Sequence, residues 1–190
     1  MSESEHGSLS IEERVRREQA HFEQLADELG NVWWGHKTLA GQTRLDQRRL
    51  LVEQWARIGP GTVVLEPGAG NGEFSSRLAK TGARIAAVEL SPKQARMGGA
   101  RFKNMKNLSF SVGDVTRLPF VDDSFDAVAG CSVLHHFPMS SALSEFRRVL
   151  KSSGRIFFTA RVAQLLKVSR TNLGPRRFEV ESTSYPILTD

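Results

Sequence analysis

The chain has 190 residues, 39% hydrophobic and 25% charged, with a net charge of +5. This length and composition are typical of one globular domain that is long enough to bury a core. The single cysteine, Cys131, excludes an internal disulfide. No apolar run approaches the ~18 residues of a membrane span. The polar segment 1–10 has no signal core, so we expect a cytoplasmic protein.

The positive charge is spread over several expected helices, where arginines stand beside acids. This arrangement favours solvated helix faces over one basic patch, so we expect no nucleic-acid partner.

Apolar side chains between positions 11 and 29 recur at intervals typical of an amphipathic helix. Ser10 and Glu13 have the spacing of a capping box at its start, and Gly30 is placed to end it. The segment 31–44 contains two tryptophans and two glycines. We interpret it as a lid over a ligand site, with a simple anchor for the first helix as the alternative. Residues 1–44 are therefore assigned to an N-terminal helical cap.

A second helix is expected over 44–58, ended by the Gly-Pro-Gly sequence at 59–61. The apolar residues expected to face inward from this helix are Leu45, Leu50, Leu51, Trp55 and Ile58.

The next segment is an apolar strand, 63–66, that ends in a carboxylate and turns through three alternating glycines into a helix. The dinucleotide fingerprint G-x-G-x-x-G fits Gly68 and Gly70, but Glu73 occupies its third position, where a carboxylate would oppose phosphates. Glu66, directly before the glycines, suits a ligand that carries positive charge. Gly72 completes the loop, and residues 73–80 are expected to form the following helix.

A second strand, 84–89, ends in Glu89, placed to accept hydrogen bonds from ribose hydroxyls. Ser91 and Pro92 are typical of a helix N-terminus, and the helix over 92–101 is weakened by two glycines. A third strand, 108–114, is expected to end in the Gly-Asp pair, with Val115 directly after it. Residues 125–130 are expected to form a fourth strand that precedes Cys131, with a helix over 138–151, a turn at 152–154 and a fifth strand over 155–160.

The chain resembles the class I S-adenosylmethionine (SAM)-dependent methyltransferases over roughly residues 45 to 160. The resemblance is carried by four features in the same order: the glycine loop, the acid of the second strand, the Gly-Asp pair, and the run L-P-F-x-D-x-S-F-D before L-H-H. The resemblance is to small-molecule enzymes that include those of quinone biosynthesis. It implies SAM as cofactor, with ribose on Glu89, adenine on Asp114 and Val115, and the methionine part against Cys131. The residues expected to bind the cofactor are Glu66, Gly68, Ala69, Gly70, Gly72, Glu89, Leu90, Asp114, Val115 and Cys131.

Strands that alternate with helices predict an α/β, Rossmann-like, doubly wound and mainly parallel sheet over 45–160, with an N-terminal helical extension. Family members usually continue with a helix and an antiparallel strand pair. In the tail, 161–190, we expect a helix over 161–170, a turn at 171–175 and weak strands at 178–180 and 185–188. We therefore expect the final hairpin to be shortened or absent and interpret the chain as C-terminally truncated.

Methyl transfer needs mainly that donor and acceptor are held in line, and a base helps when the acceptor is a hydroxyl or an acidic carbon. His135 and His136 follow the fourth strand, and we take His136 as the candidate base, with structural packing as the alternative. Cys131 has no evident partner base, which disfavours a nucleophilic role. The acids at 122, 123 and 126 lack the spacing of a calcium loop, so we expect no metal.

The leading hypothesis is a methyltransferase that acts on a small molecule, with O- or C-methylation favoured. One alternative is a catalytically silent or partner-dependent SAM-binding domain, suggested by the short tail. Another is an RNA or protein methyltransferase, which the sequence Cys-Ser-Val-Leu at 131–134 disfavours because it replaces the Asn-Pro-Pro-Tyr motif of amino-group methylation. The acceptor and the oligomeric state are not assigned.

Overall fold

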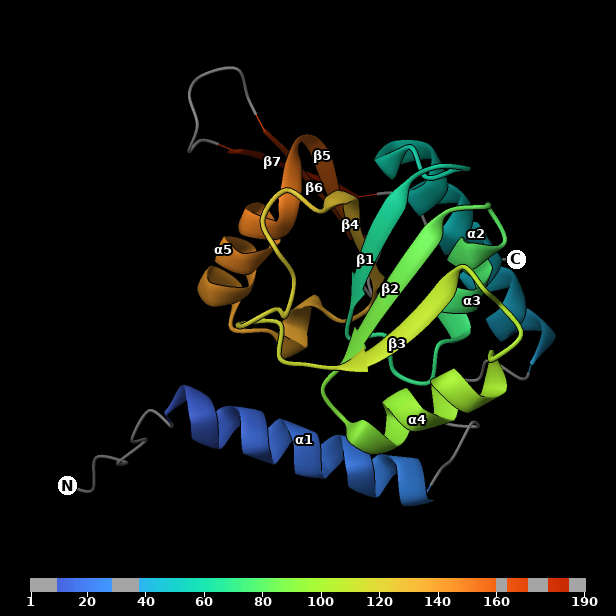
Figure 1. Cartoon of the computed structure of the whole chain (residues 1–190), viewed down its shortest axis with the longest axis vertical. Helices are drawn as coiled ribbons and strands as arrows, with labels where there is room; N and C mark the ends of the chain where they lie inside the picture. Colours follow the sequence, from blue (N-terminus) through green and yellow to red (C-terminus); the bar gives the residue numbers. More distant parts are fainter. Residues whose placement is uncertain (1–9, 29–37, 160–163, 171–177, 185–190) are drawn as a thin grey trace.

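The computed structural model describes residues 10–28, 38–159, 164–170 and 178–184. Its centre is a seven-stranded sheet with the strand order β3-β2-β1-β4-β5-β6-β7 (Figure 1). The first five strands are parallel, and the last two continue the sheet in antiparallel pairs. The strands are β1 (Val63–Pro67), β2 (Arg84–Glu89), β3 (Leu108–Val112), β4 (Phe125–Cys131), β5 (Leu150–Thr159), β6 (Gln164–Arg170) and β7 (Phe178–Ser184).

Helices cover both faces of this sheet, which confirms the predicted doubly wound, Rossmann-like architecture. Figure 1 shows α2 and α3 on one side of the strands and α5 on the other. The helices are α1 (Ile11–Glu28), α2 (Leu39–Ala56), α3 (Glu73–Ala79), α4 (Pro92–Arg101) and α5 (Met139–Val149), with a 3₁₀ turn at Leu134–His136. None of the helices described is both long and apolar enough to cross a bilayer.

Two cores result from the alternation of side chains along the strands. On β1, Val64 packs toward α2 and α3, and the next residue, Leu65, packs toward α5. On β5, Phe157 and Phe158 divide between the same two cores. Each central strand is therefore buried on both faces, which fixes the register of the residues at its carboxyl end.

Polar caps set where the N-terminal helices begin. The predicted capping box is confirmed: the Ser10 amide donates to Glu13 Oε2 at 3.0 Å, and the Glu13 amide donates to Ser10 Oγ at 3.2 Å. Thr38 accepts from the Gly41 amide at 3.0 Å and starts α2 at Leu39, earlier than the predicted 44. Half of the segment proposed as a lid, 31–37, lies outside the described residues, and the other half is Thr38 and the start of α2.

The inward face of α2 was only partly predicted. Leu45 and Ile58 are buried as expected, but Leu50 is 54% and Trp55 37% exposed, so those two assignments were wrong. Val52 and Ala56 are buried instead, one turn apart on the face toward β4 and β5. The longer helix, begun by Thr38, carries this buried face.

The C-terminal region differs most from the sequence prediction. The helix expected over 161–170 is wrong for residues 164–170, which form β6, and the hairpin expected to be shortened or absent is present as β6 and β7. The strand predicted at 178–180 is confirmed within β7, and the candidate at 185–188 lies outside the described residues. The turn predicted at 152–154 is an irregular part of β5, where the register to β4 shifts.

Candidate functional site

The carboxyl ends of β1, β2, β3 and β4 meet at one edge of the sheet, and helix α1 lies across that edge (Figure 1). In open parallel sheets, ligands bind at this edge. The glycine loop is fastened to it, because the Ala69 amide donates to the Val88 carbonyl at 3.1 Å and the Gly72 amide to the Ala69 carbonyl at 3.0 Å. The main-chain path of this loop is thus set by β2 as well as by β1.

All three loop glycines have left-handed backbone, with φ of 66° at Gly68, 55° at Gly70 and 83° at Gly72. Their surroundings differ. A Cβ at Gly68 would lie 2.6 Å from Val133 Cγ2, and one at Gly72 would lie 2.4 Å from Phe110 Cζ. At Gly70 the nearest atom is the flexible Gln94 Oε1, at 3.2 Å. Gly68 and Gly72 are therefore explained by packing, whereas Gly70 leaves room beside its backbone for a ligand.

Glu66 lies near the end of β1, directly before this loop, and is only 2% exposed. Its Oε2 atom has no hydrogen-bond partner among the described residues. Burial raises the pKa of Glu66 to about 8, the nearby Glu89 adds to the rise, and the Ser75 hydroxyl opposes it. Ser75 Oγ is close enough to lower the pKa, but no bond of ordinary geometry joins it to Glu66. A buried acceptor that lacks a partner suits a positively charged or hydrogen-bond-donating ligand group.

Glu89, the last residue of β2, binds the main chain of the glycine loop. Its Oε2 accepts from the Gly70 amide at 2.7 Å and its Oε1 from the Ser91 amide at 2.9 Å. Burial raises the pKa of Glu89, and the amides of Ser91, Gly70 and Leu90 act against this rise. Because each carboxylate oxygen can accept more than one hydrogen bond, these contacts are compatible with ribose hydroxyls as further donors.

The residues after β3 form a turn beside β2. The Gly113 amide donates to the Glu89 carbonyl at 3.0 Å, which joins the end of β3 to the end of β2. Asp114 Oδ1 accepts from the Thr116 amide at 2.8 Å, and Val115 is buried. Asp114 is half-buried, so the structure brings it to the same edge as Glu66 and Glu89.

The end of β4 contains a contact that sequence reasoning missed. Arg48, from α2, donates through Nη1 to Ser132 Oγ at 3.1 Å and to Cys131 Sγ at 3.4 Å. Ser132 has a φ of 56°, and its amide donates to the Thr159 carbonyl at 2.7 Å. Left-handed backbone costs a residue other than glycine ~1–2 kcal/mol, so the fold holds Ser132 in a strained conformation at the strand end.

The predicted base, His136, lies in the 3₁₀ turn after β4 and faces helix α1. Its Nδ1 is 3.3 Å from Glu18 Oε2, and both side chains are about one-quarter exposed, at 27% and 28%. Glu18 was not predicted, because nothing in a charged, amphipathic helix distinguishes one acid from its neighbours. The pair joins α1 to the edge that carries the glycine loop. The acids at 122 and 126 are engaged elsewhere, with Arg148 and Lys151.

These features fit the cofactor that the sequence resemblance implies. SAM carries a sulfonium and an ammonium, and the edge offers the buried Glu66 and Glu89 with a backbone opening at Gly70. The roles of the individual residues stay predictions.

Comparison with known proteins supports the same family. A family profile described as "Methyltransferase domain" matches residues 65–158, the range that contains the carboxyl ends of β1, β2, β3 and β4. The demethylmenaquinone methyltransferase of Beutenbergia cavernae is 38% identical over 117 residues, which cover 61% of this chain and 47% of the relative. The chain spans about half the length of the curated relatives it matches.

Solved structures share the fold. The YcgJ protein from Bacillus subtilis is 28% identical, with a TM-score of 0.57 over 62% of this chain and 51% of the other. A phosphoethanolamine N-methyltransferase from Haemonchus contortus, solved with phosphoethanolamine and S-adenosylhomocysteine, has a TM-score of 0.67 at 19% identity, over 83% of this chain and 34% of the other. The second likeness is one of fold alone.

Proposed function

The chain belongs to the class I SAM-dependent methyltransferases, and from this premise we propose that it transfers a methyl group to a small-molecule acceptor, at oxygen or carbon. The observation that carries the proposal is the buried Glu66, whose Oε2 has no hydrogen-bond partner among the described residues and which directly precedes a loop that is open at Gly70. This acidic cradle suits a cationic cofactor and opposes a phosphate-bearing one.

We propose that different residues at this edge of the sheet bind different parts of SAM. Glu66 is proposed to bind the ammonium group, Glu89 to accept hydrogen bonds from the ribose hydroxyls, and Asp114 to accept one from the adenine amino group. Their placement at the same edge of the sheet supports this assignment. Cys131, at the end of β4, is proposed to contact the methionine part. Bound in this way, SAM supplies a methyl group that is already activated by its positive sulfur.

The chain's own contribution to the chemistry is a positioned base. We propose that His136 takes the proton of an acceptor hydroxyl or acidic carbon, whose electron pair then forms the new bond to the methyl carbon as the sulfur–carbon bond breaks. A carboxylate at Nδ1, here Glu18, favours the tautomer in which Nε2 can accept a proton and stabilises the charged ring that results.

The relatives narrow the acceptor class. Their name, demethylmenaquinone methyltransferase, gives a quinone as the acceptor of those relatives. For the present chain, which covers about half of those relatives, we propose only a broader class, an aromatic acceptor with an ionisable hydroxyl such as a reduced quinone ring carries.

The test is turnover with methyl-labelled SAM and a panel of hydroxylated aromatic acceptors, followed by detection of labelled product. His136→Ala should lower kcat by roughly 100-fold or more and leave the Kd for S-adenosylhomocysteine within about twofold. His21→Ala, at an exposed position on α1, is the matched control and should change neither value. A chain that binds S-adenosylhomocysteine but labels no acceptor would favour the silent, partner-dependent alternative.

A further inference from the structure

The guanidinium group of Arg48 lies at the carboxyl end of β4. It belongs to α2, whose buried residues pack on one face of the sheet, and its side chain reaches past that face to the strand end. There its Nη1 contacts Ser132 Oγ and Cys131 Sγ, both neutral groups. Ser132 has a left-handed backbone conformation, and its amide donates to the carbonyl of Thr159 at the end of β5.

The charge of Arg48 is not balanced within the described part of the chain. No carboxylate among those residues pairs with it, and neither Nε nor Nη2 has a partner there. The neighbouring arginines differ: Arg49 pairs with Glu53, and Arg77 pairs with Asp46 and Glu73. A half-buried guanidinium with two unused donors is suited to bind a carboxylate in the bidentate manner.

The cofactor supplies one carboxylate, on its amino-acid end. The acids of the site, Glu66 and Glu89, suit the positive groups of SAM, but they offer no positive charge to this carboxylate. An arginine beside a sulfonium would in turn weaken binding unless its charge were neutralised. Both conditions are met if the carboxylate lies on Arg48.

We propose, on the basis of the proposed function, that Arg48 anchors the carboxylate of the amino-acid end of SAM at the end of β4. Ser132 and Cys131 orient the guanidinium, and Arg48 thereby sets the direction in which the methionine part extends from the glycine loop. This makes Arg48 a cofactor-binding residue contributed by the helix before β1.

The test compares two ligands that differ in this end. S-adenosylhomocysteine has the amino acid, whereas 5′-methylthioadenosine has the same nucleoside without it. In calorimetric titrations of the full chain, Arg48→Ala should weaken S-adenosylhomocysteine about 10- to 100-fold and leave 5′-methylthioadenosine within about twofold. Arg49→Ala is the matched control and should leave both affinities unchanged.

Arg48→Lys provides a second variant in case the alanine variant does not fold. It keeps the charge but not the planar fork, so we expect an intermediate loss that is again confined to S-adenosylhomocysteine. An equal loss of affinity for both ligands, or an unchanged affinity for S-adenosylhomocysteine in the folded variants, would overturn the assignment. In the second case the guanidinium would be left for an anionic acceptor. If the unaltered chain bound neither ligand, the proposed function itself would fail.

Discussion

The burial of Glu66 beneath the glycine loop makes the stability of the ligand-free protein depend on pH. Its folded-state pKa of about 8 lies above the ordinary 4.5, so between these values the unfolded chain has released the proton and the folded chain still holds it. The free energy of unfolding should therefore fall as pH rises through this window, by at most about 5 kcal/mol. Glu89, whose pKa is also raised, contributes with the same sign.

Glu66→Gln checks this prediction, because the amide is close in shape and does not ionise. Urea unfolding between pH 5 and pH 8, set by the two pKa values above, should give a flatter pH profile for the variant than for the unaltered chain. Identical slopes would mean that Glu66 is ionised in the folded protein.

Substitutions of the loop glycines should have two different effects: at Gly70 mainly a loss of ligand affinity, and at Gly72 mainly a loss of stability. Gly70→Ala places a methyl group 3.2 Å from the end of the flexible Gln94 side chain, which can move away. We therefore expect SAM-site affinity to fall at least tenfold, with mainly the stability cost of left-handed backbone, ~1–2 kcal/mol. Gly72→Ala forces a contact with Phe110 and should cost more stability, ~2–4 kcal/mol. Thermal unfolding with S-adenosylhomocysteine titration measures both quantities.

Gly61→Ala is the control for these variants. Gly61 also has a positive φ, 85°, but no atom of the described residues lies within 4 Å of the position that its Cβ would take. It should show the backbone cost alone, with unchanged affinity. Gly72→Ala with lost affinity and unchanged stability would contradict the packing explanation.

At the residue scale, the sequence predicted features that depend on local order. Glu66, Glu89 and the glycines follow one another at spacings that a strand and a turn dictate, and the structure brings them to one edge. Arg48 and Glu18 could not be predicted, because each reaches the edge from a helix distant in the chain. No local pattern distinguishes them from other charged residues on a helix surface.

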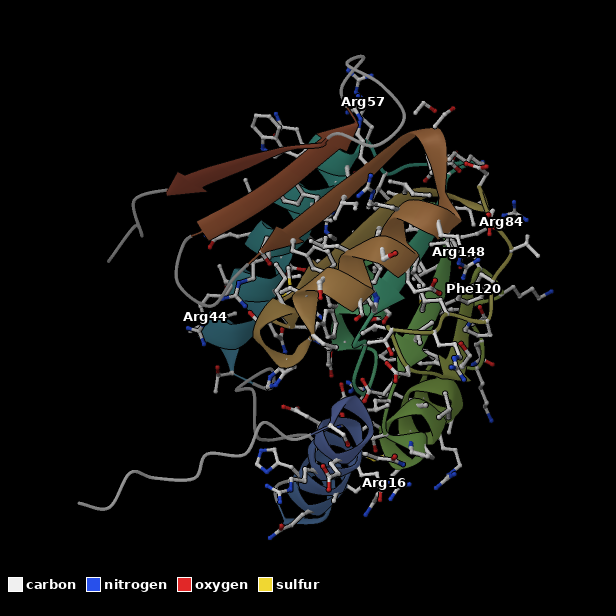
Figure 2. The ribbon with its side chains drawn as sticks, turned by 90° about the vertical axis from the view of Figure 1, so that its left-hand side faces the viewer. Arg16, Arg44, Arg57, Arg84, Phe120 and Arg148 are labelled. Carbon is white, nitrogen blue, oxygen red and sulfur yellow. The ribbon has the colours of Figure 1, made fainter. Side chains whose placement is uncertain are left out.

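At the scale of elements, Arg148 joins α5 to the segment that follows β3. It pairs with Glu145 and donates to the Phe120 carbonyl at 2.6 Å and the Leu118 carbonyl at 3.0 Å, and Asp122 accepts a further bond. Figure 2 shows Arg148 beside Phe120. This one guanidinium satisfies main-chain acceptors of a segment without regular secondary structure.

Arg148→Ala should therefore lower the free energy of unfolding by ~2–3 kcal/mol, because two carbonyls and two carboxylates lose a charged donor. Arg148→Lys keeps the charge without the fork and should recover less than half of the loss. Chemical denaturation measures both variants. A change within about 0.5 kcal/mol for the alanine variant would show that these bonds exchange freely with water.

The boundaries of elements were predicted less well than their existence. Strong signals, such as Ser91 followed by Pro92 at the start of α4, were confirmed. The start of α2 at Leu39 was missed because Thr38 was weighed as part of an irregular segment and not as a cap. The glycines of α4, interpreted as a weakness, have a packing reason, since a Cβ at Gly98 would lie 2.5 Å from Phe110 Cε1.

At the scale of the whole molecule, β6 is an interior strand of the sheet and not an edge. Val168 is paired with Ile156 of β5 on one side and with Val180 of β7 on the other. Val168→Pro removes a main-chain donor from this position and should destabilise the protein by at least ~2 kcal/mol. Val168→Thr, which keeps the β-branched shape and the amide, should cost much less.

Thermal unfolding and light scattering of the two variants test this. We expect the proline variant to unfold at lower temperature and to associate, because an unpaired β5 edge is a template for pairing. A monomeric proline variant with an unchanged melting temperature would mean that the hairpin does not support the sheet.

The hairpin also marks where sequence reasoning failed. The alternation of strands and helices through β5 is a repeating pattern, and each repeat supports the next assignment. Beyond it, residues 164–170 have mixed propensities, and pairing with β5 and β7 decides their conformation. Arginines labelled in Figure 2, Arg16, Arg44, Arg57 and Arg84, lie at separate places, in agreement with the predicted scatter of charge.

The measurement that tests the central claim most directly is calorimetric titration of the full chain with S-adenosylhomocysteine, alongside the Gly70→Ala and Gly61→Ala variants. Our account predicts one site with a Kd of about 1–50 μM in the unaltered chain and in Gly61→Ala, and at least tenfold weaker binding in Gly70→Ala. Absence of binding in a chain that unfolds cooperatively would contradict it, as would equal affinity in all three proteins.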